Sequence, residues 1–360
     1  MRLSHRTTLR LATSFALVTA PAATTVAQSS TPSGAHWYRG NTHTHTIASD
    51  GNAPVLDVAR WYKTHAYAFV VITDHELVTA VDPVNAQLAE AGKFLVLRGQ
   101  EITQKVVDSA AQDGRRQAHV VAIGIGQPIL PLGDNGNATG TAMEAVYARN
   151  LSAVKAAGGI AQVNHPNFRW SVREADLLNV PDSTLYEVWN GHPWVNNLGG
   201  VDEKGRVAPS AEALWDSLLS RGKVLLGVAT DDAHEYQQAA FEDPLATHPG
   251  RAWIMVRADT LTAPALMSSI GRGEFYASTG VTLSDYRATR SKIELTIAPP
   301  SRPEDVRRYH TQFIGRGGKV LADVYGRAAS YAIGGNEGYV RATITDSNGL
   351  QAWTQPMFVK

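Results

Sequence analysis

The sequence predicts an α/β fold built around a parallel sheet, followed by a smaller antiparallel β region. Between residue 36 and about residue 280, apolar runs typical of strands alternate with stretches typical of amphipathic helices. Several of the runs are continuously apolar, as parallel strands are when both faces of the sheet are covered. This alternation is the pattern of α/β proteins. After residue 290 no helix pattern lies between the apolar runs.

Seven segments are the strand candidates of the first region. In chain order they read "AFVVITD", "FLVLRGQE", "HVVAIGI", "IAQVNH", "LYEVWN", "VLLGVATDD" and "AWIMVRA".

Two helices are predicted between these strands. The first spans residues 142–157, where Thr141 and Glu144 have the spacing of a capping box. Its apolar stripe consists of Met143, Tyr147, Leu151 and Val154, and a glycine pair at 158–159 ends it. The second spans residues 210–221 and ends at Gly222.

The C-terminal region after residue 290, which we call the tail, has a different sequence pattern. "SKIELTIAPP" and "YVRATITD" alternate apolar and polar residues, which predicts antiparallel strands with one polar face. We therefore expect an α/β domain over residues 36–285 and an antiparallel β domain over residues 290–360.

Length and composition agree with a soluble globular protein. The chain has 360 residues, enough for two ordinary domains or one barrel with an appendage. Lys+Arg and Asp+Glu both total 33. Since no basic cluster is present either, a nucleic-acid partner is not expected.

The N-terminus has the layout of a secretory signal. "MRLSHRTTLR" carries three arginines and no acid, an apolar run follows, and "TTVAQSS" supplies small residues. The apolar run is too short for a stable membrane anchor. We expect residues 1–27 to be a signal peptide and the mature protein to be periplasmic or extracellular. It has no cysteine, so its stability does not depend on disulfides.

Histidines and acids gather at the ends of the predicted strands. Six of these residues lie there: Asp74, His75, Glu101, His165, Asp232 and His234. The carboxyl ends of parallel strands open on one face, where active sites lie. We therefore expect these side chains to meet. His119 is the exception, because it opens its strand candidate instead of closing it.

The stretch "NTHTHTIASDG" adds His43, His45 and Asp50. Side chains two residues apart on an extended segment point the same way, so the two imidazoles share one side, and Asp232 and His234 are expected to do the same. A single histidine at a strand end is more often a hydrogen-bonded core or rim residue. Many imidazoles and carboxylates at one place, however, would be costly without a cation. Without thiolates, this ligand set suits Zn, Mn or Fe rather than a structural thiolate zinc site.

These motifs, taken in order, resemble the polymerase and histidinol phosphatase (PHP) family. The resemblance rests on "HTHTIASDG", "ITDHE", "GQEI", "HVVAIG", "NHP", "DDAH" and, at residues 273–280, "GEFYASTG". It covers residues 36–280. The layout of a signal, a core and a β tail looks most like the secreted branch of the family, which includes carbamate-ester (carbaryl-type) hydrolases.

The resemblance implies a distorted (β/α)7 TIM-like barrel that holds three divalent metal ions. The first ion would be bound by His43, His45, Glu101 and Asp232. Glu101 would bridge to a second ion bound by His119 and His165. The third would be bound by Asp50, His75 and His234. Zn, Mn and Fe all occur in the family, and the spacing does not choose among them.

Charge indicates the chemistry of such a site. Three dications would carry six positive charges against three from Asp50, Glu101 and Asp232, which favours an anionic substrate such as a phosphate ester. The metals would lower the pKa of a bridging water and so supply a nucleophile. Glu101, Asp232 and His234 are thus expected at the reaction centre. Arg98 and Arg169 flank ligand motifs, where they would hold substrate oxygens or form rim ion pairs.

Two asparagines and two long segments are also expected near the site. Asn164 and Asn190 are candidate partners of ligating imidazoles. Segments 126–140 and 191–209 would cover the site or form plain surface loops.

The predicted function is an exported, trinuclear metal-dependent phosphoesterase that acts on a small-molecule phosphate ester. One alternative is a metal-dependent carboxyl- or carbamate-ester hydrolase on the same scaffold. A second is a non-catalytic metal-binding envelope module. No nucleic-acid partner and no stable membrane anchor are expected, and the oligomeric state stays open.

Overall fold

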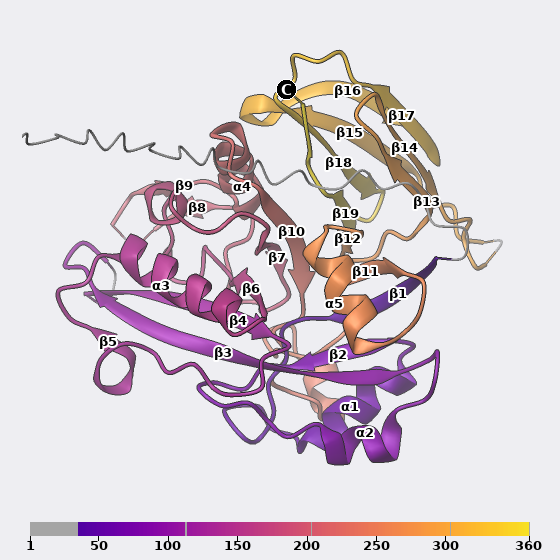
Figure 1. Ribbon diagram of the computed structural model, residues 1–360. Coiled ribbons are helices and arrows are strands. Elements are labelled where there is room, and N and C mark those ends of the chain that lie inside the picture. The colour runs from indigo at the N-terminus through magenta and orange to yellow at the C-terminus, as the bar shows by residue number, and fades with distance from the viewer. Residues whose placement is uncertain (1–34, 112–113, 203, 303, 360) are drawn as a thin grey trace, which may run out of the picture.

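The computed structural model describes residues 35–111, 114–202, 204–302 and 304–359 (Figure 1). The predicted signal peptide, residues 1–27, lies outside the described residues. Within the described ranges, no helix combines the length and the apolar character needed to cross a membrane.

Fifteen of the described strands form one large mixed sheet. Its main path runs in the order β10 (Leu225–Thr230), β7 (Thr184–Asn190), β6 (Ile160–Val163), β4 (Arg115–Ile123), β3 (Leu95–Val107), β2 (Phe69–Ile72), β1 (His36–Asn41), β11 (Trp253–Ala258), β12 (Phe275–Ser278), β19 (Gln351–Thr354), β18 (Tyr339–Asp346), β15 (Tyr309–Gly315) and β16 (Lys319–Tyr325). β5 (Asn137–Ala138) pairs with β3, and β20 (Met357–Phe358) pairs with β18. The seven predicted strands of the first region all lie in this sheet.

The sheet differs from the expected distorted (β/α)7 TIM-like barrel. β1, β2 and β3 are parallel neighbours, as are β6, β7 and β10, but β4 runs antiparallel to both β3 and β6. On its other side β1 pairs with β11 in antiparallel fashion. Among the described residues no ladder joins β10 back to β1, so the sheet is open. An isolated bridge between Thr44 and Ala233 nevertheless holds the segments after β1 and β10 side by side.

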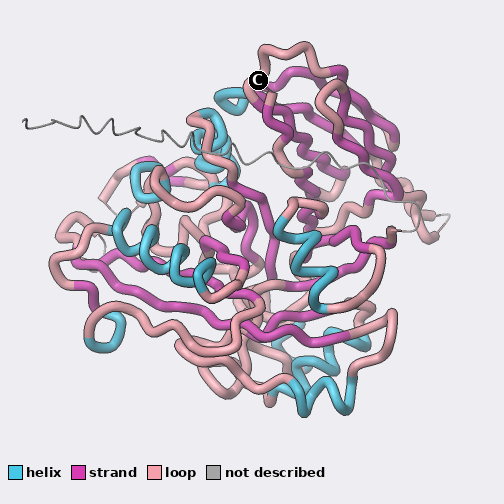
Figure 2. Tube along the Cα trace, in the orientation of Figure 1, coloured by secondary structure: helices cyan, strands magenta, loops and turns pink. Residues whose placement is uncertain are grey.

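The helices lie on the outside of the sheet (Figure 2). They are α1 (Val55–Thr64), α2 (Asp82–Leu88), α3 (Met143–Ala156), α4 (Ala211–Ser220) and α5 (Ala263–Gly271), with short 3-10 turns η1 (Asp134–Gly136), η2 (Glu174–Leu177), η3 (Gln238–Phe241) and η4 (Arg316–Gly318). Both predicted helices are present as α3 and α4. The predicted capping box of α3 is wrong, because its N-cap is Ala142 and no side chain caps it. α4 begins with a side-chain cap, in which the Ser210 hydroxyl accepts the N–H of Ala213.

Two strands that lead into the candidate ligand residues, β2 and β10, are buried along their whole length. All four residues of β2 and all six of β10 are buried, as the continuous apolar runs predict. α4 packs directly on β10, because Gly227 leaves room for the indole of Trp215. A Cβ at position 227 would lie 2.6 Å from that ring. The apolar contact therefore fixes β10, whose carboxyl end carries Asp232 and His234.

The tail is antiparallel β structure, seen in orange and yellow at the upper right of Figure 1. β13 (Leu283–Ala288), β14 (Lys292–Ile297) and β17 (Ala328–Ala332) form a separate three-stranded sheet, and β8 (Gly200–Val201) pairs with β9 (Val207–Ala208) in the first region. β14 alternates buried and exposed residues as predicted. The tail is not detached, since β19 pairs with β12 of the first region.

β18 does not have the expected solvent-facing polar side. Arg341 is fully buried, and its guanidinium donates to Asp216 of α4 through Nε at 2.8 Å and Nη2 at 2.6 Å. The hydroxyl of Tyr339 donates to the same carboxylate at 2.8 Å. The tail is thus tied to the helix that supports β10.

Candidate metal centre

The nine predicted ligand residues converge at one end of the sheet. Seven of them line a cavity of about 620 Å³, which we call the metal cavity. His43 and His45 lie fully buried beneath it. The other residues that line the metal cavity are Ser49, Glu76, Thr103, Lys105, Gln117, Phe168, Arg169 and His192.

Four side-chain atoms lie close together, and they come from the four residues expected to bind the first ion. The Nε2 atoms of His43 and His45 both lie 3.2–3.3 Å from Glu101 Oε2 and from Asp232 Oδ1. Both Nε2 atoms are buried and have no hydrogen-bond partner in the described part of the chain. Ligands 2.0–2.2 Å from a tetrahedral zinc ion are about 3.3 to 3.6 Å apart. The residues present therefore fit a divalent ion.

Glu101 faces two groups with its two oxygens. While Oε2 belongs to the first group, Oε1 lies 3.1 Å from His119 Nδ1 and 3.4 Å from His165 Nε2. The side-chain amide of Asn164 donates to Oε1 at 2.6 Å and fixes the carboxylate. Glu101 thus faces both groups, as a carboxylate would if it were to bridge two ions.

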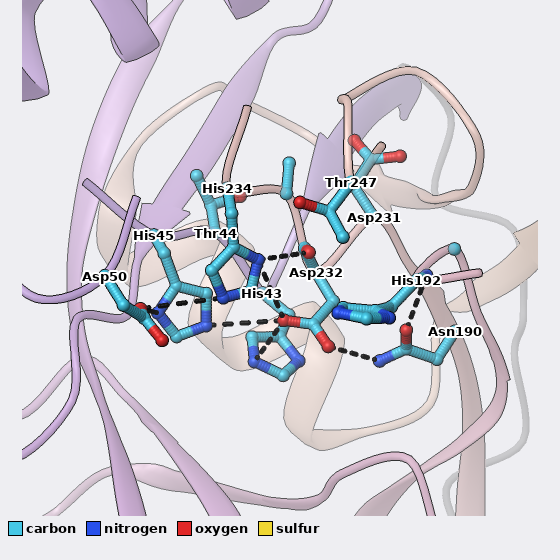
Figure 3. A network of polar contacts seen from close by, with 12 residues as sticks. His43, Thr44, His45, Asp50, Asn190, His192, Asp231, Asp232, His234 and Thr247 are labelled. Carbon is cyan, nitrogen blue, oxygen red and sulfur yellow. Dashed lines mark hydrogen bonds and ion pairs between the residues drawn. The ribbon is translucent and has the colours of Figure 1, made fainter. Parts of the chain in front are cut away.

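A third group surrounds Asp50 (Figure 3). Its Oδ2 lies 3.3 Å from His75 Nε2, and its Oδ1 lies 3.5 Å from His234 Nε2. His45 Nδ1 also lies 3.3 Å from Oδ1. His45 thus stands between the first and third groups, one ring nitrogen toward each.

The electrostatics of the centre favour positive charge. Burial opposes protonation of His45, but Asp232 and Glu101 outweigh burial and raise the pKa of His45 to about 9. Burial would likewise raise the pKa of Glu101, but the surrounding imidazoles hold it well below its usual range. Carboxylates that draw protons onto a neighbouring imidazole would draw a dication in the same way.

Glu187, on β7, holds the first group in place. This fully buried side chain lies 2.8 Å from His43 Nδ1. It therefore orients the imidazole ring of His43, whose Nε2 faces Glu101 and Asp232. It also accepts the backbone N–H of His165 at 2.5 Å and the amide of Asn190 at 2.8 Å. A carboxylate behind a ligating histidine sets its tautomer and raises its basicity.

Further polar contacts fix the other ligands. The amide of Asn190 also donates to Asp232 Oδ2 at 3.1 Å (Figure 3). Asn164 and Asn190 thus contact ligand carboxylates rather than the imidazoles expected for them. His75 Nδ1 lies 2.6 Å from Thr103 Oγ1, and His119 Nε2 lies 3.0 Å from Gln117 Oε1.

The loop that carries Asp50 is held by Asp74. This buried carboxylate accepts the backbone N–H of Thr46 at 2.7 Å and the hydroxyl of Ser49 at 2.8 Å. Asp74 therefore shapes the loop, although it belongs to none of the candidate ligand groups.

Strand direction explains the position of His119. Because β4 runs antiparallel to β3, His119 stands opposite Thr103, two residues beyond Glu101. The reversed strand brings it to the same end of the sheet as the ligands that close parallel strands.

One expectation about backbone geometry is wrong. Asp232 has a φ of 51° and is not on an extended segment, so the rule for residues two apart does not apply to Asp232 and His234. Asp232 lies beside His43 and His45 of the first group, and His234 belongs to the third. His165 also has a positive φ, 23°. Uncommon backbone conformations of this kind cluster at functional sites.

The two predicted arginines lie in different places. Arg169 lines the metal cavity, with its guanidinium carbon 5.6 Å from the centre of the Phe168 ring. Arg98 forms an ion pair with Asp82 and is not among the residues that line the metal cavity. His192, which is not one of the predicted ligands, lines the cavity with its ring centre 5.9 Å from that of His234.

Sequence reasoning missed Glu187 and Lys105. Glu187 lies inside the apolar run "LYEVWN", and an acid in a strand buried on both faces is itself a signal that a partner exists. Lys105 follows Glu101 by four residues, and thus shares its face of the extended strand β3.

Comparisons with known proteins give similar structures but no sequence match. No protein-family model and no curated protein matches the chain. A two-domain protein from Bacteroides vulgatus that contains a predicted PHP-like metal-dependent phosphoesterase is 14% identical, with a TM-score of 0.41, over 90% of this chain and 96% of that one. A putative metal-dependent phosphoesterase from Bifidobacterium adolescentis is 15% identical, with a TM-score of 0.33, over 54% and 87%.

A third similar structure is an amidohydrolase from Chromobacterium violaceum with bound sulfate. It is 15% identical, with a TM-score of 0.35, over 54% of this chain and 87% of that one. At these identities and TM-scores, similarity assigns no role to any residue of this chain. The solved structures that are similar to it thus include two described as predicted or putative metal-dependent phosphoesterases, one of them as PHP-like.

Proposed function

We propose that the chain is a metal-dependent phosphoesterase of the PHP type that binds three divalent ions and hydrolyses a small phosphate ester. The observation that carries the proposal is the first ligand group. Two buried imidazole nitrogens without hydrogen-bond partners face two carboxylate oxygens at 3.2–3.3 Å. Left without a cation, such atoms lose the hydrogen bonds that water would give them.

Charge favours a phosphate ester over a neutral ester. Three dications would carry six positive charges, and Asp50, Glu101 and Asp232 would supply three negative ones. Glu187, buried beside His43, adds a fourth negative charge, so about two positive charges remain. Arg169 contributes another positive charge to the wall of the metal cavity. A site with this balance attracts an anion.

The residues that line the metal cavity would have two roles, metal binding and substrate binding. Glu101, His119 and His165 form the second group, and all three line the metal cavity, so a substrate oxygen can reach this group. Arg169 lies where it would hold a phosphoryl oxygen, whereas Arg98 lies outside this wall. When bound, divalent ions supply an activated water and stabilise negative charge on the phosphoryl oxygens.

The test combines elemental analysis with a matched pair of substrates. Protein loaded with Zn, Mn or Fe is assayed on phenyl phosphate and on phenyl acetate. Phenyl phosphate hydrolysis that disappears on chelation supports the proposal. Hydrolysis of phenyl acetate or an aryl carbamate alone would assign the site to carboxyl- or carbamate-ester chemistry. Stoichiometric metal with no hydrolysis of any ester would favour a non-catalytic metal-binding module.

We further propose that the protein is exported, on the basis of the predicted signal at residues 1–27. Cell fractionation of the full chain tests this, and a cytosolic, unprocessed product would contradict it. A single-stranded DNA cleavage assay tests the expected absence of a nucleic-acid substrate.

A further inference from the structure

A second cavity opens from the wall of the metal cavity. This side cavity has a volume of about 440 Å³ and shares Glu76, Thr103 and Lys105 with the metal cavity. Its outer wall is formed by Leu130, Pro131, Gly133, Asn135 and Gly136. Both volumes are within the range of pockets that hold small ligands. The site therefore has more room than a phosphoryl group needs.

The outer wall of the side cavity is firmly held. The buried side chain of Gln100 donates to the carbonyl of Ile129 at 2.9 Å and accepts its N–H at 2.8 Å. Gln104 makes the same reciprocal pair with Leu132, at 2.8 and 2.7 Å. β5 also pairs with β3, with Asn137 opposite Lys105. The side cavity is thus built into the fold before any ligand binds.

Lys105 is the cation at the junction of the two cavities. Its ammonium makes no hydrogen bond or ion pair with any described residue. Glu76 lies in the same wall, but its carboxylate accepts the N–H of Thr103 at 2.6 Å and forms no ion pair with Lys105. Lys105 follows Glu101 by four residues on β3, which places the two Cα atoms about 13 Å apart at the usual strand rise.

An unpaired cation beside a dication site requires an explanation. Bound metals would repel the Lys105 ammonium, and this repulsion is relieved when an anion lies between the charges. We propose that Lys105 binds a second anionic group of the substrate, so that the preferred substrate is a phosphate ester whose leaving group carries a phosphate or a carboxylate. The inference rests on the proposed function, because the first anionic group is the scissile phosphate.

The test compares leaving groups that differ only in charge. Substrates are 4-carboxyphenyl phosphate, its uncharged analogue 4-carbamoylphenyl phosphate, and 1,4-phenylene bisphosphate. We expect kcat/KM to be about 10- to 100-fold higher for the carboxylate than for the amide, the usual range for a charge-assisted hydrogen bond. Lys105→Gln should abolish this ratio, chiefly by lowering kcat/KM for the carboxylate substrate. Lys105→Arg should retain it.

A control separates local binding from loss of overall charge. Lys93→Gln removes the same charge at an exposed ion pair with Glu90, outside both cavities, and should leave the ratio unchanged. A preference for the bisphosphate alone would identify the second group as a phosphate. An equal preference for the carboxylate substrate would mean that the side cavity accepts either anion.

A binding measurement keeps this inference separate from the proposed function. Calorimetry of the metal-loaded protein with 4-carboxyphenylphosphonate and 4-carbamoylphenylphosphonate needs no turnover. A Kd ratio of about 10 or more in the wild type that falls to about 1 in Lys105→Gln supports the second site even if no ester is hydrolysed. An equal ratio in both proteins overturns it, even if phenyl phosphate is hydrolysed.

Discussion

Replacing Glu187 by Gln tests whether the buried carboxylate behind His43 supports the metal centre. The substitution keeps the shape of the side chain and removes its charge. In the wild type, Oε1 accepts from Gln162 at 3.0 Å and from Thr230 at 2.7 Å, and lies 2.8 Å from His43 Nδ1. Oε2 accepts from the backbone N–H of His165 and from Asn190.

The expected loss of stability follows from the number of donors that the substitution leaves without an acceptor. An NH₂ group at the Oε2 position cannot accept, so two donors lose their partner; at the Oε1 position three do. An unsatisfied buried donor costs about 1 to 3 kcal/mol, so the variant should lose about 2 to 6 kcal/mol of unfolding free energy in the orientation that leaves only two donors unpaired. Loss of the carboxylate behind His43 should also weaken binding of the first ion about 10- to 100-fold.

Two measurements check these values. Competition with a chromophoric chelator gives the affinity of each bound ion, and urea denaturation of the metal-free protein gives the stability. Glu294→Gln is the matched control, because Glu294 is exposed and forms an ion pair with Lys292 at the surface. Wild-type affinity for every ion together with wild-type stability in the Glu187 variant would refute the role assigned to this residue.

Three further predictions concern the bridge, the cavity wall and the tail. Glu101→Ala should remove ligands of two groups, so elemental analysis should find about two fewer bound ions; an unchanged metal content would contradict the bridging assignment. His192→Ala should leave the metal content intact, and a lost ion would mean that His192 is a ligand. Arg341→Met should leave Asp216 as an uncompensated buried charge and cost about 3 to 5 kcal/mol in denaturant unfolding. Adding Asp216→Leu should restore most of that loss, and a single variant as stable as the wild type would mean that the tail does not hold α4.

The positions of the strands and of the candidate ligands could be predicted because both depend on local sequence. Continuous apolar runs such as "AFVVITD" and "VLLGVATDD" become strands that are buried on both faces, and their polar ends emerge together at one end of the sheet. The spacing of His43 and His45 also holds, since both Nε2 atoms face the same two carboxylate oxygens. Their assignment to particular ions stays a prediction.

Strand direction and closure could not be predicted, because they depend on pairings between distant segments. "HVVAIGI" reads the same whether its strand runs parallel or antiparallel to β3. The capping pattern at Thr141 and Glu144 failed for a related reason: Glu144 instead accepts a hydrogen bond from Asn179, a residue of a later segment. A tertiary contact of this kind removes the side chain that the local motif needs.

For Glu187, the sequence predicts that a buried partner exists but not which residue it is. An acid flanked by Tyr186 and Val188, both buried, must be satisfied inside the protein, so a partner could be inferred from the sequence. The identity of that partner could not, because His43 lies 144 residues away and reaches Glu187 only through the pairing of β6, β7 and β10 and the bridge between Thr44 and Ala233. Lys105 presents the opposite case. No described residue pairs with its ammonium, so we look for its partner in the substrate.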